Sequence, residues 1–323
     1  MSEGLDDVMM QAILVRQSGG PEVLQPGEVI VPEPRRDELL VRVLAAGVGP
    51  WDVHLRRGDR TGPLPYIPGG EFADDVVGGT GAGAGFDDGT PVYGYPALTG
   101  CYAQYVTCPV ERLAPIPAGL NVIEAAATPI AALTAYQGVL EILTVGEGDR
   151  VLITAGAGGV GHFAVQMAYM RNAIVTATAS PQHHEFLHKL GAAIVVDHTS
   201  PDWPDQVREM NDGGVTRVLA CVAPTLAGAA RAARDGAVIA TPVHAAEYPD
   251  AGRVRWQPYD GERSGSRLVR MAPRFDDGSL SVHVSGRYFW QDAAEAHRVV
   301  EQGHTKGKIA LVVDEDLAAT LEV

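Results

Sequence analysis

The chain has 323 residues, which is long enough for two domains of roughly 150 residues each. Hydrophobic residues make up 46% of the sequence and charged residues 20%, a balance that excludes an intrinsically disordered chain. The 40 acidic and 25 basic residues give a formal net charge of −15, which repels phosphate backbones and anionic lipid surfaces. We therefore expect a small-molecule substrate as the partner, with no nucleic acid and no membrane.

The cysteines and the first residues indicate the compartment. Cys101, Cys108 and Cys221 are an odd number and show no CxxC spacing, so neither a disulfide framework nor a structural zinc lobe is expected. Residues 1–10 are acidic and lead into no apolar segment of a signal peptide. No stretch reaches the roughly 18 to 20 apolar residues of a membrane helix. These features predict a cytoplasmic protein.

The first 120 residues are predicted to form short β-strands with little regular helix. β-Branched and apolar residues between Gly and Pro turn signals predict strands over residues 11–16, 38–46, 90–95 and 102–108. The glycine-rich run at residues 78–85 leads into a turn signal, so we expect it to be a loop between strands. Together these segments predict a β-rich, barrel-like unit.

Strands and helices alternate from about residue 120 onward. The helical patterns cover residues 122–138, 160–171, 182–190 and 226–234, and the strand patterns cover residues 150–154, 173–179, 194–197, 217–222 and 237–241. This alternation predicts an α/β domain with a doubly wound parallel sheet. It stops after residue 250, where residues 293–302 form the only clear late helix.

A glycine-rich turn is the most informative motif of the sequence. It fits the pattern GxGxxG directly after a predicted strand and at the start of a predicted helix. In that context glycines let backbone N–H groups and the positive end of the helix dipole approach a pyrophosphate. Asn172, which follows the helix, is expected to form a left-handed C-terminal cap. The residues that we assign to cofactor binding are Gly156, Ala157, Gly158, Gly159, Val160 and Gly161.

The end of the next strand indicates which dinucleotide is bound. NAD-specific sites usually place Asp or Glu there, about 20 residues past the glycines, and the segment that ends at Ser180 has no acid. Ser180 leaves room for a 2′-phosphate, to which His183 and His198 could supply positive charge. NADP(H) is therefore favoured, although NAD stays open because no arginine stands beside Ser180.

Residues 184–188 also match HExxH, the signature of a zinc protease. On a helix this spacing places His184 and His188 on one face, with Glu185 as the general base. The motif lies on the helix after the second strand of a dinucleotide fold, and no third ligand is apparent nearby. We therefore interpret it as a helix start near the adenosine end of the cofactor.

Five further segments are informative because of their order along the chain. They are GGPEVL at residues 19–24, AAGV at 45–48, PGGEFA at 68–73, AALTAY at 131–136 and GHTKGK at 303–308. With the glycine-rich turn they resemble the zinc-independent medium-chain dehydrogenase/reductases, specifically the quinone oxidoreductase-like branch. The resemblance runs through nearly the whole chain.

The resemblance implies two domains and a reaction. A GroES-like β-barrel-type catalytic domain would take residues 1–120 and 266–323, and a Rossmann domain would take residues 121–265. Reduced nicotinamide would deliver hydride, in the cleft between them, to a quinone or to the β-carbon of an activated alkene. Zinc-dependent members of the family place Cys and His ligands where this chain has Gly49 and Gly70, which implies a reaction without a metal ion.

The resemblance also implies site residues. On the substrate side His54 stands where Tyr is common and is the preferred donor, with an ordinary surface or packed histidine as the alternative. Asp52 and Tyr66 are further candidates, for which bonding to the local backbone and packing are the alternatives. The residues assigned to the cofactor by family position are Thr134, Val222, Thr241 and Val243.

The chain also departs from the branch, and these departures keep other functions open. Gly49 stands where many relatives carry Asn, and Pro242 replaces a glycine. One alternative is an enoyl reductase that tailors a secondary metabolite, and another is an NADPH-binding sensor or structural protein that has lost turnover. A homodimer is expected from the resemblance alone.

Overall fold

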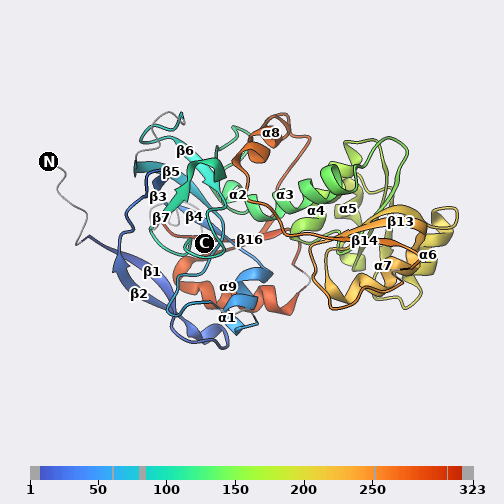
Figure 1. Cartoon of the computed structure of the whole chain (residues 1–323), viewed down its shortest axis with the longest axis horizontal. Helices are drawn as coiled ribbons and strands as arrows, with labels where there is room; N and C mark the ends of the chain where they lie inside the picture. The colour runs from blue at the N-terminus through green and yellow to red at the C-terminus, as the bar shows by residue number, and fades with distance from the viewer. Residues whose placement is uncertain (1–7, 60–61, 80–84, 251, 304, 315–323) are drawn as a thin grey trace. The chain divides into compact units, whose positions relative to one another are not determined.

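The computed structural model describes residues 8–59, 62–79, 85–250, 252–303 and 305–314, and the chain forms two compact units (Figure 1). Unit 1 comprises residues 1–130, 263–278 and 282–323, and unit 2 comprises residues 131–262 and 279–281. In the sequence, unit 2 is therefore inserted into unit 1.

Unit 1 is built on mostly antiparallel strands. They are β1 (Met9–Val15), β2 (Leu24–Ile30), β3 (Glu38–Arg42), β4 (Ala45–Val48), β5 (Phe72–Gly79), β6 (Pro91–Gly94), β7 (Tyr105–Pro109), β8 (Leu113–Pro115), β15 (Val284–Phe289) and β16 (Lys308–Val312). The main sheet has the order β15-β16-β4-β5-β3-β7, and β6 and β8 continue from β5. β1 and β2 form a separate antiparallel pair. The predicted β-rich unit is confirmed. Most of the glycine-rich run at residues 78–85 lies outside the described residues.

The interior of unit 1 takes side chains from both ends of the chain. Ile13, Val41 and Phe72 belong to one buried cluster together with Trp290 and Leu311. Burial of apolar surface contributes about 25 cal/mol per Å², so the C-terminal segment adds directly to the stability of this unit.

Within the described residues unit 1 has four helices, of which two were not predicted from the sequence. They are α1 (Pro50–Arg57), α2 (Val122–Ala126), α8 (Gly265–Asp276) and α9 (Ala293–Gln302). The expectation of little regular helix before residue 120 is confirmed for the described residues, although α1 itself was not predicted. The expectation of a single late helix is wrong at α8, which buries Leu268, Met271 and Phe275 at helical spacing although Pro273 lies inside it. Ser264 caps α8 by accepting a hydrogen bond from the Arg267 N–H.

Unit 2 contains a parallel sheet of six strands. They are β9 (Arg150–Ile153), β10 (Ile174–Ala179), β11 (Ile194–Asp197), β12 (Val215–Leu219), β13 (Ala233–Thr241) and β14 (Arg255–Pro258). Their order is β11-β10-β9-β12-β13-β14, and every neighbouring pair is parallel. Numbered within the unit this is the order 3-2-1-4-5-6 of a Rossmann fold, whose switch point lies between the first and fourth strands. The predicted doubly wound sheet is confirmed, but the expectation that the alternation stops after residue 250 is wrong at β14, its sixth strand.

The helices of this half of the chain precede the sheet or lie between its successive strands. They are α3 (Pro129–Tyr136), α4 (Gly159–Tyr169), α5 (His184–Lys189), α6 (Trp203–Met210) and α7 (Leu226–Ala232). The single helix predicted over residues 122–138 is divided, because Pro129 starts α3 and disfavours helical geometry in the residue before it. A π-helical turn then covers Gln137–Ile142. Asn172 has a φ of 59°, which confirms the left-handed cap predicted after α4.

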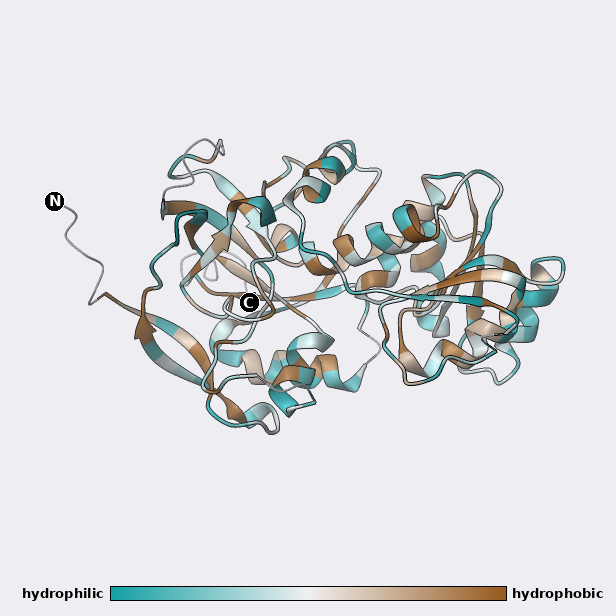
Figure 2. Cartoon of the chain, in the orientation of Figure 1, coloured by the Kyte–Doolittle hydropathy of each residue, from teal (hydrophilic) through white to brown (hydrophobic). Residues whose placement is uncertain are grey.

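The helices contain both hydrophilic and hydrophobic residues. Figure 2 shows helices banded in hydrophilic and hydrophobic residues, as expected for elements with one face toward a core. Within the described ranges no helix combines the length and the apolar content needed to cross a membrane.

Candidate functional site

The glycine-rich turn joins β9 to α4 at the carboxyl edge of the parallel sheet. α4 begins at Gly159, and its N-cap Gly158 has extended backbone. The N–H groups in the first turn of a helix have no partner within the helix, and together with the helix dipole they favour an anion. Ala155, just before the turn, has a φ of 50°, a costly value for a residue other than glycine.

Each glycine of the motif has a distinct steric reason. A Cβ at Gly156 would lie 2.9 Å from the Ala177 Cβ, and one at Gly161 would lie 2.7 Å from the Gly156 Cα, so both positions require glycine for packing. A Cβ at Gly158 would meet only the Ala155 carbonyl oxygen, at 3.3 Å. Gly158 is therefore the position where the missing side chain keeps the helix end open, and the turn fits a pyrophosphate.

Two of the residues predicted to hold the adenosine end lie together. Ser180 follows β10, His198 follows β11, and the Ser180 Oγ is 3.2 Å from the His198 Nε2. His183 lies in the short turn before α5, where its Nε2 is 3.4 Å from the Gln182 Nε2. His184 is 3.2 Å from the Ala179 carbonyl oxygen through its own Nε2.

The remaining predicted cofactor residues also make contacts within the fold or lie at strand ends. The Thr241 hydroxyl donates to the Ala220 carbonyl at 2.7 Å and accepts from the Val243 N–H at 3.1 Å, so it joins the ends of two strands. Val222 also follows β12 and is 38% exposed. Thr134 is buried in α3, and its carbonyl accepts a hydrogen bond from the Tyr259 hydroxyl. The structure thus places Thr241 at the end of β13, and Val222 and Val243 just beyond strand ends, at the sheet edge that binds ligands in this fold.

The substrate-side candidate Asp52 lies in the first turn of α1. Its Oδ2 accepts the Gly49 N–H at 2.9 Å, while its Oδ1 makes no hydrogen bond of normal geometry with the described residues. Burial raises the pKa of Asp52 to about 7, and the charge of Glu71 also raises it. The Gly49 N–H, the charge of Lys308 and the backbone N–H of Gly69 act in the opposite direction.

A buried ion pair adjoins Asp52. The Lys308 Nζ lies 2.9 Å from the Glu71 Oε1 and donates to the Val48 carbonyl at 3.2 Å. The Glu71 Oε2 accepts the Ile130 N–H at 2.7 Å. Both side chains are almost completely buried, in a medium where charges interact far more strongly than in water.

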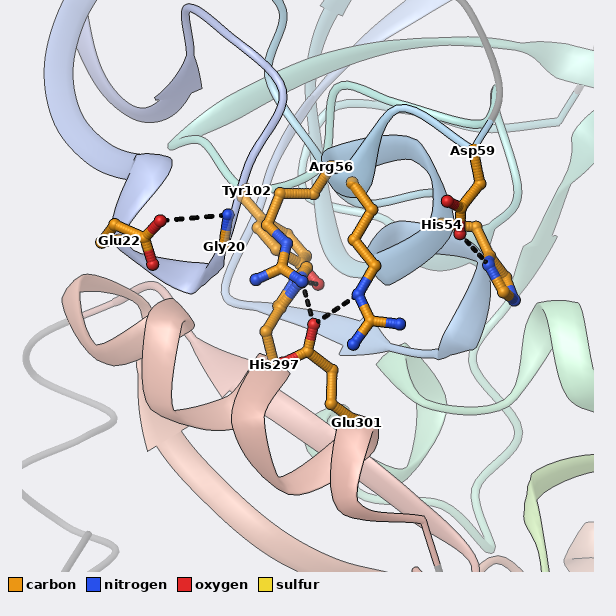
Figure 3. Close-up of polar contacts among 9 residues, drawn as sticks. Gly20, Glu22, His54, Arg56, Asp59, Tyr102, His297 and Glu301 are labelled. Atoms are coloured by element: carbon orange, nitrogen blue, oxygen red, sulfur yellow. Dashed lines mark hydrogen bonds and ion pairs between the residues drawn. The ribbon is translucent and has the colours of Figure 1, made fainter.

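Tyr66 and a second buried cluster complete the interior of unit 1. Burial, and then the charge of Asp52, raise the pKa of Tyr66 to about 12. Arg56 is fully buried and pairs with Glu301, which also receives the Arg57 Nε at 3.0 Å (Figure 3). This pairing joins α1 to α9.

His297 on α9 belongs to the same cluster. Its Nε2 lies 3.3 Å from the Tyr102 hydroxyl, and its Nδ1 has no partner among the described residues. Burial, and then the charge of Arg56, lower the pKa of His297 to about 3, so the imidazole is neutral at physiological pH.

His54 is separate from these groups. Figure 3 shows His54 and Asp59 on the other side of α1 from Glu301. The His54 Nδ1 is 2.7 Å from the Asp59 Oδ2, and about half of each side chain is exposed. Asp52 and Tyr66 therefore interact with each other in the interior, whereas His54 pairs with Asp59 at the surface.

Sequence reasoning missed the two partners of Asp52. Glu71 and Lys308 both stand in segments that carry the family resemblance, yet they are far apart in the sequence. Only the pairing of β16 with β4, in which Ile309 opposes Val48, brings Lys308 to the start of α1. Hydrophobic strand patterns contained no signal for that register.

The described residues do not fit a metal ion. No group of three or more His, Cys, Asp or Glu side chains among them could hold one. A Cβ at Gly70 would lie 3.0 Å from the Ile130 Cδ1 and 3.1 Å from the Ala97 carbonyl oxygen, so a larger ligand there would require rearrangement.

The HExxH segment forms the short helix α5. His184 contacts the Ala179 carbonyl oxygen, the His188 Nδ1 is 2.8 Å from the Ala192 carbonyl oxygen, and Glu185 pairs with Lys189 at 2.7 Å on the exposed surface. These contacts stabilise the helix and its ends.

Two protein families match parts of the chain. Residues 35–118 match the alcohol dehydrogenase GroES-like domain, and residues 190–311 match the family described as zinc-binding dehydrogenase.

Curated relatives extend these matches. A probable quinone oxidoreductase of Schizosaccharomyces pombe is 30% identical over 325 residues, which cover 95% of this chain and 98% of the relative. A chloroplastic quinone-oxidoreductase homolog of Spinacia oleracea is 37% identical over 195 residues, which cover 57% of this chain and only 59% of the relative. A trans-enoyl reductase of Aspergillus terreus is 29% identical, over 86% of this chain and 87% of the relative.

Solved structures agree with this assignment. A quinone oxidoreductase from Coxiella burnetii has a TM-score of 0.87 at 28% identity and covers 95% of this chain and 100% of its own. A mycobacterial protein in complex with NADPH has a TM-score of 0.85 at 29% identity, over 94% of this chain and 100% of its own. This chain belongs to the medium-chain dehydrogenase/reductase family of oxidoreductases, in its quinone oxidoreductase-like branch.

Proposed function

We propose that the protein is an NADPH-dependent reductase that transfers hydride to a quinone or to an α,β-unsaturated carbonyl compound without zinc. The observation that carries the proposal is the glycine-rich turn at the carboxyl edge of a 3-2-1-4-5-6 sheet, where Gly158 leaves the start of α4 open. The NADPH bound by the mycobacterial neighbour supports the choice of cofactor.

Bound NADPH would supply the hydride, and the residues of the chain would bind and orient it. The turn Gly156–Gly161 would hold the pyrophosphate through backbone N–H groups and the helix dipole. Ser180, His183 and His198 would face the 2′-phosphate, and Thr134, Val222, Thr241 and Val243 would line the rest of the cofactor site.

On the substrate side we assign Asp52, His54 and Tyr66. Positioning and electrostatic stabilisation of the reduced acceptor account for much of the catalysis in such a reaction. We also expect a homodimer. A reducing compartment such as the cytosol suits three cysteines that are all free thiols.

Two observations favour other functions. The trans-enoyl reductase relative supports an enoyl substrate within the same reaction class. Gly49 contributes no polar side chain beside Asp52, which favours a protein that binds NADPH without turning it over.

The deciding experiment follows NADPH oxidation against a panel of quinones and a panel of enones and enoyl thioesters. We expect turnover on at least one panel. Tight NADPH binding without turnover on either panel would contradict the reductase and support the binding protein.

Cofactor preference is tested with His183→Ala and His198→Ala, singly and together. We expect NADPH affinity to fall several-fold and NADH affinity to stay unchanged, because only NADPH carries the 2′-phosphate. His188→Ala, on α5 and with its Nδ1 2.8 Å from the Ala192 carbonyl oxygen, is the control. Equal affinities for both cofactors in the wild type and in every variant would contradict the assignment.

A further inference from the structure

Three histidine side chains lie at the carboxyl ends of two neighbouring strands of unit 2. His183 and His184 follow β10, at the start of α5, and His198 is the first residue after β11. The two strands pair in parallel with Ala179 opposite Asp197, so the residues that follow them lie at one edge of the sheet. All three histidines are partly exposed, and we call them the histidine cluster.

Hydrogen bonds hold the histidine cluster around Ser180. The Ala179 carbonyl oxygen accepts the His198 backbone N–H at 3.4 Å and lies 3.2 Å from the His184 Nε2. A carbonyl oxygen can only accept, so the His184 Nε2 keeps its hydrogen and the Nδ1 is the atom that gains or loses a proton. The Ser180 Oγ lies 3.2 Å from the His198 Nε2, and the Ser180 carbonyl accepts the His183 N–H at 2.9 Å. The cluster is thus built around the residue that we assign to the 2′-phosphate.

One carboxylate interacts with the histidine cluster. Asp197 ends β11, and its Oδ1 accepts the Thr199 N–H at 2.9 Å and the Thr199 hydroxyl at 2.8 Å. These hydrogen bonds, and then the charges of His198 and His184, hold the pKa of Asp197 below its ordinary value. Asp197 is therefore ionised throughout the neutral range and opposes the charge of the imidazoles.

Other charged residues on the neighbouring elements are engaged elsewhere. α4, which packs on β10, contains no Asp, Glu, Lys or Arg. On α5, on α6 and before α6, the pairs are Glu185 with Lys189, Asp205 with Arg231, Asp202 with Gln206, and Arg208 with the Ala233 carbonyl. The charge of this site therefore depends mainly on three imidazoles and Asp197. It is positive when the imidazoles are protonated and negative when they are neutral.

The fold brings the adenosine ribose to the same place. β10 is the second strand of the 3-2-1-4-5-6 order, and in this fold the end of that strand meets the 2′ position of the ribose. Sites for NADP usually hold the 2′-phosphate with an arginine, which stays charged at every physiological pH. In this chain histidines take that place, and histidine ordinarily changes its charge between pH 5 and 8.

We propose that pH sets the choice of cofactor, because the histidine cluster binds the 2′-phosphate of NADPH with protonated imidazoles while Asp197 repels it. This inference rests on the proposed function, in which Ser180, His183 and His198 face the 2′-phosphate. The preference for NADPH over NADH is then highest in mildly acidic solution and falls as pH rises. His184 and Asp197 become determinants of cofactor specificity together with the residues already assigned.

The direction of the effect follows from the charges. A phosphate monoester loses its second proton near pH 6, so above about pH 6.5 mainly the charge of the protein changes. Between pH 6.5 and 8.5 NADPH affinity should fall by about tenfold, because each exposed ion pair contributes a few-fold. NADH affinity should stay constant over this range, because its ribose carries a neutral hydroxyl in place of the phosphate.

The experiment measures the dissociation constants of NADPH and NADH for the full chain by isothermal titration calorimetry at pH 6.5, 7.5 and 8.5. At pH 7.5 the titrations are repeated in two buffers of different ionisation enthalpy. Binding of NADPH should take up protons, because the phosphate favours the charged imidazoles, and binding of NADH should not. Replacing all three histidines of the cluster by Gln should abolish both the pH dependence and the proton uptake.

Two further variants make the test specific. His188→Gln is the matched control, because His188 lies on α5 but has its Nδ1 2.8 Å from the Ala192 carbonyl oxygen, and it should keep the wild-type pH dependence. Asp197→Asn retains an oxygen for the Thr199 N–H and removes the negative charge. It should raise NADPH affinity several-fold at pH 8.5 and leave NADH affinity unchanged.

The outcomes separate this inference from the proposed function. A ratio of NADPH to NADH affinity that is constant from pH 6.5 to 8.5 would overturn the inference alone, provided that NADPH oxidation still occurs with an acceptor. A loss of the pH dependence in His188→Gln as complete as in the triple variant would also overturn it. A protein that binds neither cofactor at any pH would overturn the reductase and the inference together. Circular dichroism checks the fold of the triple variant, and the wild type and Asp197→Asn decide the question if that variant does not fold.

Discussion

Two buried ionisable side chains make the free energy of unfolding of unit 1 depend on pH between about 3 and 7. Asp52 has a pKa of about 7 in the folded protein against an ordinary value of 3.8, and it binds more protons folded than unfolded between these values. His297 has a pKa of about 3 against 6.5, and it binds fewer protons folded than unfolded in that window. The two groups therefore oppose each other in their effect on stability.

For Asp52→Asn we expect stabilisation at alkaline pH. The wild type loses stability as pH rises from about 4 to 7, because the buried carboxyl must ionise without a cation of its own. Asn can still accept the Gly49 N–H and carries no charge. The free energy of unfolding in urea should exceed that of the wild type by about 2 to 4 kcal/mol at pH 8 and match it near pH 4. An equal difference at both pH values would show that Asp52 does not titrate in this range.

For His297→Gln we expect a flatter acid limb. The wild type should lose stability as pH falls from 6.5 toward 3. In this range His297 is protonated in the unfolded chain, while the buried imidazole of the folded protein stays neutral. The variant has no such proton, so its loss between pH 7 and pH 4.5 should be smaller by about 1 to 3 kcal/mol. Urea unfolding at the two pH values measures this, with the exposed His244→Gln as control. A loss in His297→Gln as steep as in the wild type would contradict the assignment.

Among the elements, the turn between β9 and α4 has the strictest steric demands. Gly161→Ala should lower both NADPH affinity and stability, since its Cβ would press on the Gly156 Cα at 2.7 Å and push α4 from the strand. We expect a loss of about 2 kcal/mol or more in the free energy of unfolding and at least tenfold in affinity. Gly146→Ala is the matched control, because its Cβ would have no atom within 4 Å. Fluorescence titration with NADPH and urea unfolding distinguish the two variants.

Much of unit 2 could be predicted from its sequence because its elements are locally specified. Five of its six strands are short apolar runs that the sequence predicts, and the GxGxxG turn identifies the first of them, whereas α6 and β14 were not predicted. α1 and α8 were missed for different reasons. α1 is short and begins in a Gly-Pro pair that reads as a turn, while Pro273 argues against helix in α8 although Leu268, Met271 and Phe275 keep helical spacing.

The parts of the candidate site also differ in how far the sequence could predict them. The phosphate-binding turn depends on neighbouring residues and was visible in the sequence. The group formed by Asp52, Glu71 and Lys308 depends on strand register between distant segments, so the sequence contained its members without their association. The contact between Ser180 and His198 could be predicted in part, because parallel strands in known order bring their carboxyl ends together.

In the whole molecule, unit 1 depends on residues from both sides of the inserted unit. Without residues 282–323 the cluster containing Ile13 and Phe72 loses Trp290 and Leu311, and Glu71 loses Lys308. We expect a chain ending at residue 281 to keep unit 2 folded and leave unit 1 open. Limited proteolysis should then cleave within residues 8–120 while residues 131–262 resist. Equal resistance of both regions would contradict this dependence.

The pairing of β16 with β4 has a consequence for the newly made chain. Until β16 emerges from the ribosome, β4 has a neighbour on one side only, and Glu71 and Asp52 stand together as two acids without a lysine. At about 5 to 20 residues per second, the inserted unit would be complete for several seconds before the last strand arrives. During that interval the exposed edge of β4 is a place where another segment of the nascent chain could pair wrongly. Mutual repulsion between Asp52 and Glu71 would disfavour such pairing before Lys308 arrives.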